Sequence, residues 1–106
     1  MASEKIVHLT DENFDSTISE GTVLVDFWAQ WCGPCVLMNR SISELAKENV
    51  ANVAVAKVDT MLHPSLAGQY AVSGLPTVII FKSGKQVNRK TGSLTRQQLN
   101  EMIEKI

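Results

Sequence analysis

Residues 22–35 read Thr-Val-Leu-Val-Asp-Phe-Trp-Ala-Gln-Trp-Cys-Gly-Pro-Cys, and they indicate the fold more clearly than the rest of the chain. The first eight are almost continuously apolar and rich in branched and aromatic side chains, which is typical of a central strand covered on both faces. From residue 34 to residue 49, polar side chains separate apolar ones that recur at helical spacing: Met38, Ile42, Leu45 and Ala46. We therefore expect a buried strand over residues 22–29 and an amphipathic helix directly after it.

The rest of the chain alternates strand and helix signals without a linker, a repeat or a low-complexity run. Further strands are expected at residues 5–9, 52–59, 77–82 and 86–91, and further helices at residues 11 to about 19, 64–70 and 96–106. A strand–helix–strand series implies a parallel pair with a right-handed crossover, whereas the Ser83-Gly84-Lys85 turn favours an antiparallel hairpin. The predicted fold class is α/β, a mixed sheet flanked by helices on both faces.

Residues at the predicted helix ends support these boundaries. Thr10 is expected to be the N-cap of the helix that begins at Asp11, with Gly21 closing it. Thr95 and Gln98 have the spacing of a capping box at the start of the last helix. The residues that this helix is expected to bury are Leu99, Met102, Ile103 and Ile106, and those expected to fill gaps in the core are Met38, Met61 and Met102.

The composition is that of a globular protein. The chain has 106 residues, of which 44% are hydrophobic and 20% charged, and a formal net charge of -1. This size predicts one domain over residues 1–106, and the charge balance argues against disorder and against a basic surface for nucleic acid. No apolar run approaches the ~20 residues of a membrane span, and residues 1–10 lack the apolar core of a secretory signal. We therefore expect a cytoplasmic protein that contacts neither nucleic acid nor membranes.

The two cysteines, Cys32 and Cys35, lie close together, which in a reducing compartment suggests reactivity more than a structural role. Cys32 follows a buried strand and opens a helix, so its sulfur is expected near unpaired N–H groups and the positive end of the helix dipole. Pro34 suits the first turn, where its missing donor has no partner within the helix. These surroundings favour the thiolate, which is the nucleophile. We expect an exposed Cys32 to attack a client disulfide and a sheltered Cys35 to resolve the mixed disulfide.

Two other interpretations of the cysteine pair remain open. A zinc site needs two further ligands, and the remaining candidates, His8 and His63, are not spaced as a Cys-Cys-His-His site requires. A purely structural disulfide would close a loop so short that it removes little chain entropy. Reactivity is the better explanation, and both histidines are expected to be solvated or locally bonded side chains.

Five segments together resemble the thioredoxin family and span essentially the whole chain. They are Val-Asp-Phe-Trp-Ala at 25–29, Trp-Cys-Gly-Pro-Cys at 31–35, Val-Ala-Lys-Val-Asp at 55–59, Gly-Leu-Pro-Thr at 74–77 and Phe-Lys-Ser-Gly at 81–84. The resemblance implies the thioredoxin fold, with a central mixed sheet of five strands and about four helices. It also implies a redox-active electron carrier with protein-disulfide reductase activity, acting in cell redox homeostasis.

The resemblance carries further expectations about cofactors and partners. It implies a monomer with no bound cofactor or metal, which takes electrons from NADPH through the flavoprotein thioredoxin reductase and passes them to disulfide-containing client proteins. Gly33 and Pro34 between the cysteines resemble the reducing members of the fold. An oxidase or isomerase of the same fold remains an alternative, as does a binding module that acts without redox chemistry.

Asp26 is the only charge in the apolar strand that ends beside the cysteines, and alternation places it on one face with Leu24 and Trp28. Burial would raise its pKa, and such a carboxylate beneath Cys35 could take the thiol's proton as Cys35 attacks. The resemblance assigns Asp26 this role. A structural acid paired with Lys57 is the alternative, and Lys57 could tune Asp26 without touching the substrate.

Leu75-Pro76 is where the resemblance places a cis peptide bond, next to the cysteines. The residue before that proline would offer backbone hydrogen bonds to an extended client segment, a form of strand addition that tolerates many sequences. An apolar rim for clients would then surround Cys32, formed with Pro76 by Trp31, Gly33, Pro34, Val72, Gly74, Leu75 and Gly92. Ordinary turn or core roles are the alternative for each, and Gly92 in particular could mark any close backbone approach.

The chain departs from the family pattern at Val36 and Arg40, where many thioredoxins carry a basic residue and a proline. Losing the positive charge beside Cys35 should favour the Cys32 thiolate slightly less. Losing the proline restores a backbone donor and removes a usual cause of a helix kink. We expect intact activity with an altered client or reductase preference.

Overall fold

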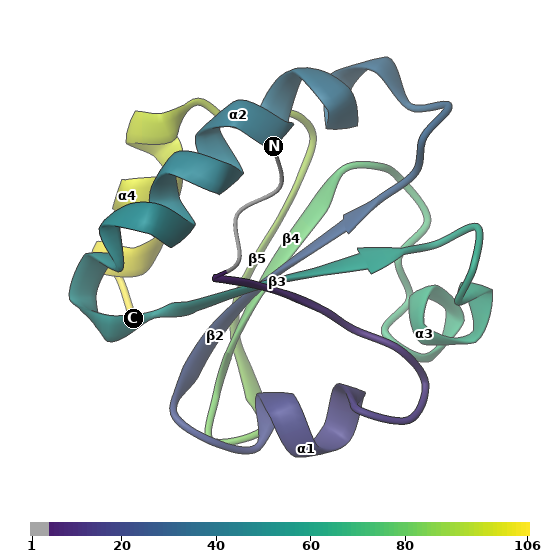
Figure 1. The fold of residues 1–106 in the computed structure, drawn as a ribbon, viewed down its shortest axis with the longest axis horizontal. Coiled ribbons are helices and arrows are strands. Elements are labelled where there is room, and N and C mark those ends of the chain that lie inside the picture. Colours follow the sequence, from purple (N-terminus) through teal and green to yellow (C-terminus); the bar gives the residue numbers. More distant parts are fainter. Residues whose placement is uncertain (1–4) are drawn as a thin grey trace.

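The computed structural model describes residues 5–106 as a sheet with helices on both faces (Figure 1). In chain order the elements are β1 (Ile6–His8), α1 (Phe14–Ile18), β2 (Thr22–Trp28), α2 (Gly33–Glu48), a 3-10 turn (Val50–Asn52), β3 (Ala54–Asp59), α3 (Pro64–Gln69), β4 (Thr77–Lys82), β5 (Lys85–Thr91) and α4 (Arg96–Glu104). Within these residues the sheet has five strands in the order β1-β3-β2-β4-β5. The expected α/β class with a mixed sheet is confirmed.

The central strand is β2, as its apolar sequence predicts. It pairs in parallel with β3 and antiparallel with β4, so that Asp26 lies opposite Lys57 on one side and Val78 on the other. The hairpin of β4 and β5 is antiparallel, and β1 pairs in parallel with β3 at the edge. These directions bring five segments to one end of the sheet: those that follow β1, β2, β3 and β5, and the one that precedes β4.

The sheet divides the core into two layers. Helices α2 and α4 lie together over one face, and α1 and α3 cover the other (Figure 1). In the first layer Leu24 of β2 packs with Ile42 and Leu99 from the helices. In the second layer Phe14 and Phe81 meet edge to face, with ring centroids 5.9 Å apart. Because both faces of β2 are covered, its sequence is apolar on both.

The first helix is shorter than expected. The Thr10 hydroxyl oxygen accepts from the N–H groups of Glu12 and Asn13, and the Asn13 Oδ1 atom accepts from the Thr10 N–H at 2.7 Å. Such side-chain bonds give the backbone an alternative to a helix, and they hold residues 11–13 in a turn. The expectation of a helix from Asp11 with Thr10 as its N-cap is therefore wrong, because α1 begins at Phe14 with Asn13 as its N-cap.

The start of β3 and the end of α4 also differ from the expected boundaries. The strand expected from residue 52 begins at Ala54, because Val50–Asn52 form a 3-10 turn. The capping box of Thr95 and Gln98 is confirmed, but α4 ends at Glu104 and Ile106 beyond it is 41% exposed. The expected burial of Ile106 is wrong. None of the helices in residues 5–106 has the length and apolar character needed to cross a membrane.

Candidate active site

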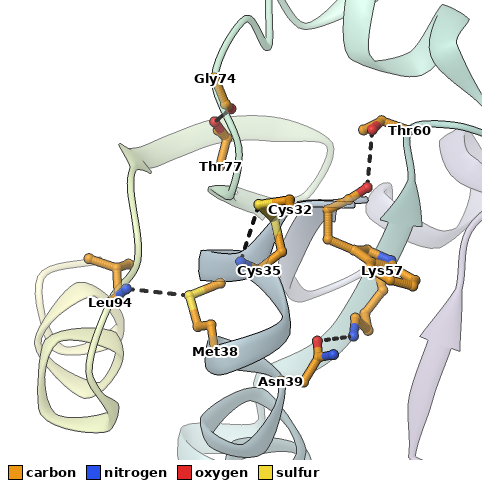
Figure 2. The surroundings of a disulfide bond; sticks show 10 residues. Cys32, Cys35, Met38, Asn39, Lys57, Thr60, Gly74, Thr77 and Leu94 are labelled. Carbon is orange, nitrogen blue, oxygen red and sulfur yellow. Dashed lines mark hydrogen bonds between the residues drawn. A yellow bond between two sulfur atoms is a disulfide. The ribbon is translucent and has the colours of Figure 1, made fainter. Parts of the chain in front are cut away.

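Cys32 and Cys35 lie at the junction of β2 and α2, joined by a disulfide bond whose Cα atoms are 5.3 Å apart (Figure 2). Cys32 is the N-cap of α2, and its sulfur accepts the backbone N–H of Cys35 at 3.2 Å. Pro34 occupies the first turn. The sulfur of Cys32 therefore takes the position in which side-chain acceptors stabilise a helix start, and negative charge is favoured there by the helix dipole.

Both cysteines are buried in the disulfide form. Cys32 is 3% exposed and Cys35 is 0% exposed, and both pack with Ala29 in a small cluster that Trp28 and Leu75 cover in part. The expectation of an exposed Cys32 is wrong for this state, because Leu75 from the loop before β4 packs against the pair. The two sulfurs are distinguished by their places at the helix cap and within the first turn more than by exposure.

Asp26 lies in β2 on the face that α2 covers, and it is fully buried. Neither of its carboxyl oxygens has a hydrogen-bond partner among the described residues. Burial raises the pKa of Asp26 to about 7, and the positive charge of Lys57 opposes this rise. A carboxyl group with this pKa exchanges its proton near neutral pH.

Lys57 lies opposite Asp26 on β3, but its ammonium group is bonded elsewhere. Its Nζ atom donates to the Asn39 Oδ1 atom at 2.6 Å (Figure 2) and stands 4.6 Å from the centre of the Trp28 ring. The ion pairs within residues 5–106 join Arg40 to Glu44, His63 to Asp11 and Arg96 to Glu48, and do not include Asp26. Burial lowers the pKa of Lys57, which the charge of Asp26 partly offsets.

Of the residues expected to form a client rim, Leu75 packs against the disulfide, whereas Val72 packs with the core layer that α1 and α3 cover. The Leu75-Pro76 peptide bond is cis, as the resemblance implies. The Gly92 N–H donates to the Pro76 carbonyl at 2.8 Å, which ties the loop after β5 to the loop before β4. The Thr77 hydroxyl donates to the Gly74 carbonyl at 2.6 Å (Figure 2). In the structure Trp31, Gly33 and Pro34 are exposed, and Val72, Gly74, Leu75 and Gly92 are half-buried.

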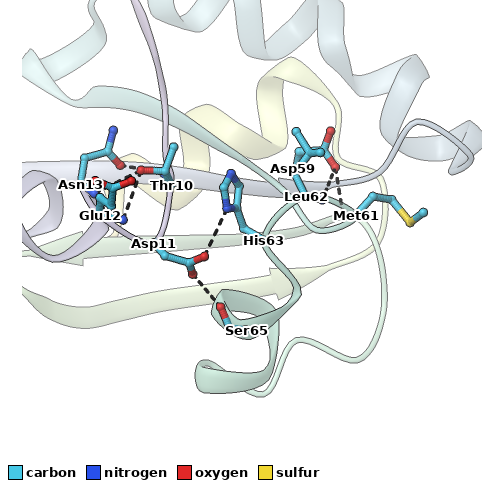
Figure 3. Close-up of polar contacts among 9 residues, drawn as sticks. All are labelled: Thr10, Asp11, Glu12, Asn13, Asp59, Met61, Leu62, His63 and Ser65. Atoms are coloured by element: carbon cyan, nitrogen blue, oxygen red, sulfur yellow. Dashed lines mark hydrogen bonds and ion pairs between the residues drawn. The ribbon is translucent and has the colours of Figure 1, made fainter.

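Met61 and Leu62 are surface residues that the sequence interpretation missed. With Trp31 they line a hollow of about 320 Å³ whose other walls are Gln30 and Asp59. Trp31 is 70%, Met61 63% and Leu62 72% exposed, so the expectation that Met61 fills the core is wrong. The Asp59 side chain accepts the N–H groups of Met61 and Leu62 and turns the chain outward (Figure 3). An aspartate at a strand end is a turn signal, and it could have predicted this exposure.

The remaining polar residues near this end form local contacts. The Asp11 carboxylate accepts the Ser65 hydroxyl at 2.6 Å and lies 3.4 Å from the His63 Nδ1 atom (Figure 3). The Ser65 bond, with help from His63, lowers the pKa of Asp11. Within residues 5–106, no three His, Cys, Asp or Glu side chains gather in a way that could hold a metal ion.

A disulfide at a helix N-terminus, at the end of a mixed sheet whose central strand carries a buried carboxyl group, is the arrangement of a thiol–disulfide oxidoreductase. The thioredoxin family model matches residues 5–105. A thioredoxin from Staphylococcus saprophyticus is 42% identical over 100 residues, and one from Staphylococcus aureus is 40% identical over the same length. Both alignments cover 94% of this chain and 96% of the relative.

Solved structures agree with the sequence relatives. A mutant thioredoxin from Halobacterium salinarum NRC-1 has a TM-score of 0.87 and 32% identity, covering 99% of this chain and 93% of that one. The chain belongs to the thioredoxin family and has the thioredoxin fold. Its Cys32–Cys35 pair gives it the family's protein-disulfide reductase function.

Proposed function

We propose that Cys32 and Cys35 reduce client disulfides in two exchange steps. The Cys32 thiolate attacks one client sulfur, which forms a Cys32–client disulfide and releases the other client sulfur as a thiolate. Cys35 then loses its proton and attacks the Cys32 sulfur, which closes the Cys32–Cys35 disulfide and releases the second client thiolate. Two electrons pass from the pair to the client. The observation that carries this proposal is the position of Cys32 as the N-cap of α2.

Asp26 is the group that accepts the Cys35 proton in the second step. Its support is the fully buried, unpartnered carboxyl group on the face of β2 that α2 covers, with a pKa of about 7. An acceptor with this pKa can take a proton from a thiol and return it to solvent in the same pH range. Lys57 acts on Asp26 through its charge and does not touch the client.

Clients bind along the end of the sheet that surrounds the disulfide. The backbone beside Pro76 pairs with an extended client segment, which tolerates many sequences. The apolar rim of Trp31, Gly33, Pro34, Val72, Gly74, Leu75, Pro76 and Gly92 contacts side chains next to the client disulfide. The hollow beside Trp31 extends this rim past β2 to the loop that follows β3, where Met61 and Leu62 receive a large apolar client side chain.

The oxidised pair is returned to the dithiol by thioredoxin reductase, a flavoprotein that draws its electrons from NADPH. This route is the family's, and it fits a chain that acts in the cytoplasm as a monomer of one domain over residues 1–106, without a bound cofactor. The reducing direction rests on the Gly33-Pro34 pair between the cysteines and on the stabilisation of thiolate at a helix start.

The first test is the reduction potential of the Cys32–Cys35 pair in dithiothreitol and glutathione buffers, measured beside NADPH-coupled insulin reduction with a thioredoxin reductase. A reducing value with turnover supports the proposal. An oxidising value supports an oxidase or isomerase instead. A reducing value without turnover, together with partner binding that survives Cys32→Ser/Cys35→Ser, supports a binding module.

A further inference from the structure

Asp26 and Lys57 face each other on neighbouring strands, yet their charged groups do not pair. They are register partners of β2 and β3, and both are buried. The Lys57 Nζ atom is instead 2.6 Å from the Asn39 Oδ1 atom and lies over the Trp28 ring. Both oxygens of Asp26 lack a partner among residues 5–106. An acceptor on α2 therefore competes with Asp26 for the Lys57 ammonium group.

The competition matters because Lys57 supplies the positive charge that acts on Asp26. An opposite charge within about 4–6 Å lowers the pKa of a carboxyl group by roughly 1–3 units. Other groups around Asp26 carry no fixed charge. On β4 its register partner is Val78, the titratable groups of α2 at this end are the two cysteines, and α4 faces this layer with Leu99, Met102 and Ile103.

We propose that Asn39 is a positioning residue whose side-chain carbonyl holds the Lys57 ammonium group against Trp28 and away from the Asp26 carboxyl group. The 2.6 Å bond offsets the cost of burying the ammonium group, which Asp26 would otherwise offset. Asn39 thus leaves Asp26 without a partner and able to accept a proton near neutral pH. This inference rests on the role proposed above for Asp26.

The test follows the Asp26 carboxyl carbon by NMR during a pH titration of the disulfide form, in which the cysteines do not titrate. The hollow beside Lys57 is also lined by the titratable side chains of His8, Asp59 and His63. The measurement must therefore resolve the signal of the Asp26 carboxyl carbon from the effects of these neighbours. Asn39→Leu removes the acceptor and keeps a similar volume. It is expected to lower the pKa of Asp26 by about one pH unit or more, because Lys57 is free to turn toward it.

Two further variants separate positioning from a structural effect. Asn39→Asp keeps an acceptor for Lys57 and adds negative charge, so the pKa of Asp26 is expected to stay level or rise. In a Lys57→Met background, Asn39→Leu is expected to leave the pKa of Asp26 unchanged, because the ammonium group that Asn39→Leu would otherwise release is absent. Ser43→Ala, one helical turn further along α2, is the matched control. Its Asp26 titration should match that of the unaltered protein.

The proposal is overturned if Asn39→Leu leaves the Asp26 titration in place, or lowers its midpoint equally with and without Lys57. Unfolding temperatures of all variants show whether each is folded at the titrated pH. The role of Asp26 itself is tested separately by Asp26→Asn, scored by the rate at which Cys35 resolves a mixed disulfide. If that rate is unchanged, the proton-acceptor role fails while the Asn39 titration can still succeed.

Discussion

The burial of Asp26, a residue that the sequence singles out, makes the stability of the protein depend on pH. Asp26 is fully buried, and burial raises its pKa from the ordinary value of 3.8 to about 7. Between these two values the unfolded chain loses the Asp26 proton while the folded protein keeps it. The folded state then binds more protons than the unfolded state, so its stability falls as pH rises through this range. Above pH 7 both states are ionised, and the folded state bears the full cost of a buried charge.

We predict that Asp26→Asn removes this pH dependence. The difference of about three pH units corresponds to about 4 kcal/mol. Relative to the unaltered protein, the variant should gain stability of that order between pH 4 and pH 8. Urea unfolding of both disulfide forms across this range measures the gain. If the unfolding free energies of the unaltered protein and of Asp26→Asn differed by the same amount at every pH from 4 to 8, the burial of an ionisable Asp26 would be contradicted.

The two cysteines are predicted to differ in how much mixed disulfide with a client accumulates when each is replaced by serine. A Cys35→Ser variant should accumulate a mixed disulfide between Cys32 and a client, because the resolving thiol is missing. A Cys32→Ser variant should accumulate far less, since Cys35 sits within the first turn of α2 and does not occupy the N-cap position that favours the Cys32 thiolate. Non-reducing electrophoresis after exposure to a disulfide-containing client measures both. Equal trapping by the two variants would refute the assigned order of attack.

At the scale of elements, the sequence predicted β2 and α2 well and α1 poorly, for physical reasons. Residues 22–29 are apolar on both faces, and α2 has a clear apolar stripe, so packing and pattern agree. The start of α1 depends instead on mutual side-chain bonds of Thr10 and Asn13. Both residues are good N-caps, and the pattern alone does not decide between them.

The capping box of α4 gives a prediction that separates stability from activity. The Thr95 hydroxyl accepts the Gln98 N–H at 3.1 Å, and the Gln98 side chain accepts the Thr95 N–H at 2.9 Å. Thr95→Ala should lower the free energy of unfolding by about 1 kcal/mol. Insulin reduction should be unchanged under conditions where the protein is folded, because α4 does not reach the disulfide cluster. Denaturant unfolding measures the first effect, and a loss of turnover in the folded variant would count against this separation.

At the scale of the whole molecule, the topology brings to one end of the sheet segments that are far apart in the sequence. Cys32 follows β2, Met61 follows β3, Pro76 precedes β4 and Gly92 follows β5. The cysteines and Asp26 could be predicted because a motif and a single charge in an apolar strand mark them. The burial of Cys32 beneath Leu75 could not, because it depends on how the loop before β4 packs across the cysteines.

The apolar surface at this end is predicted to select clients by the side chains beside their disulfides. Trp31, Met61 and Leu62 are the walls of one hollow that lies beyond β2 from the Pro76 loop. A client cysteine flanked by a leucine or phenylalanine can bury that side chain in the hollow while its backbone pairs beside Pro76. Met61→Gln/Leu62→Gln removes apolar surface on one side only and leaves the cysteines and Asp26 unaltered.

The double variant should raise the KM for a disulfide peptide with a flanking phenylalanine by about tenfold, from the loss of roughly 1–2 kcal/mol of apolar burial. For the same peptide with serine in place of phenylalanine, the KM should change little. The matched control is Val87→Gln, an exposed apolar residue on β5 at 45% exposure that is not part of the hollow. Selection is shown if the KM for the serine peptide divided by the KM for the phenylalanine peptide falls in the double variant and is unchanged in the control. An equal rise for both peptides would mean that Met61 and Leu62 support the fold of the loop and not the choice of client.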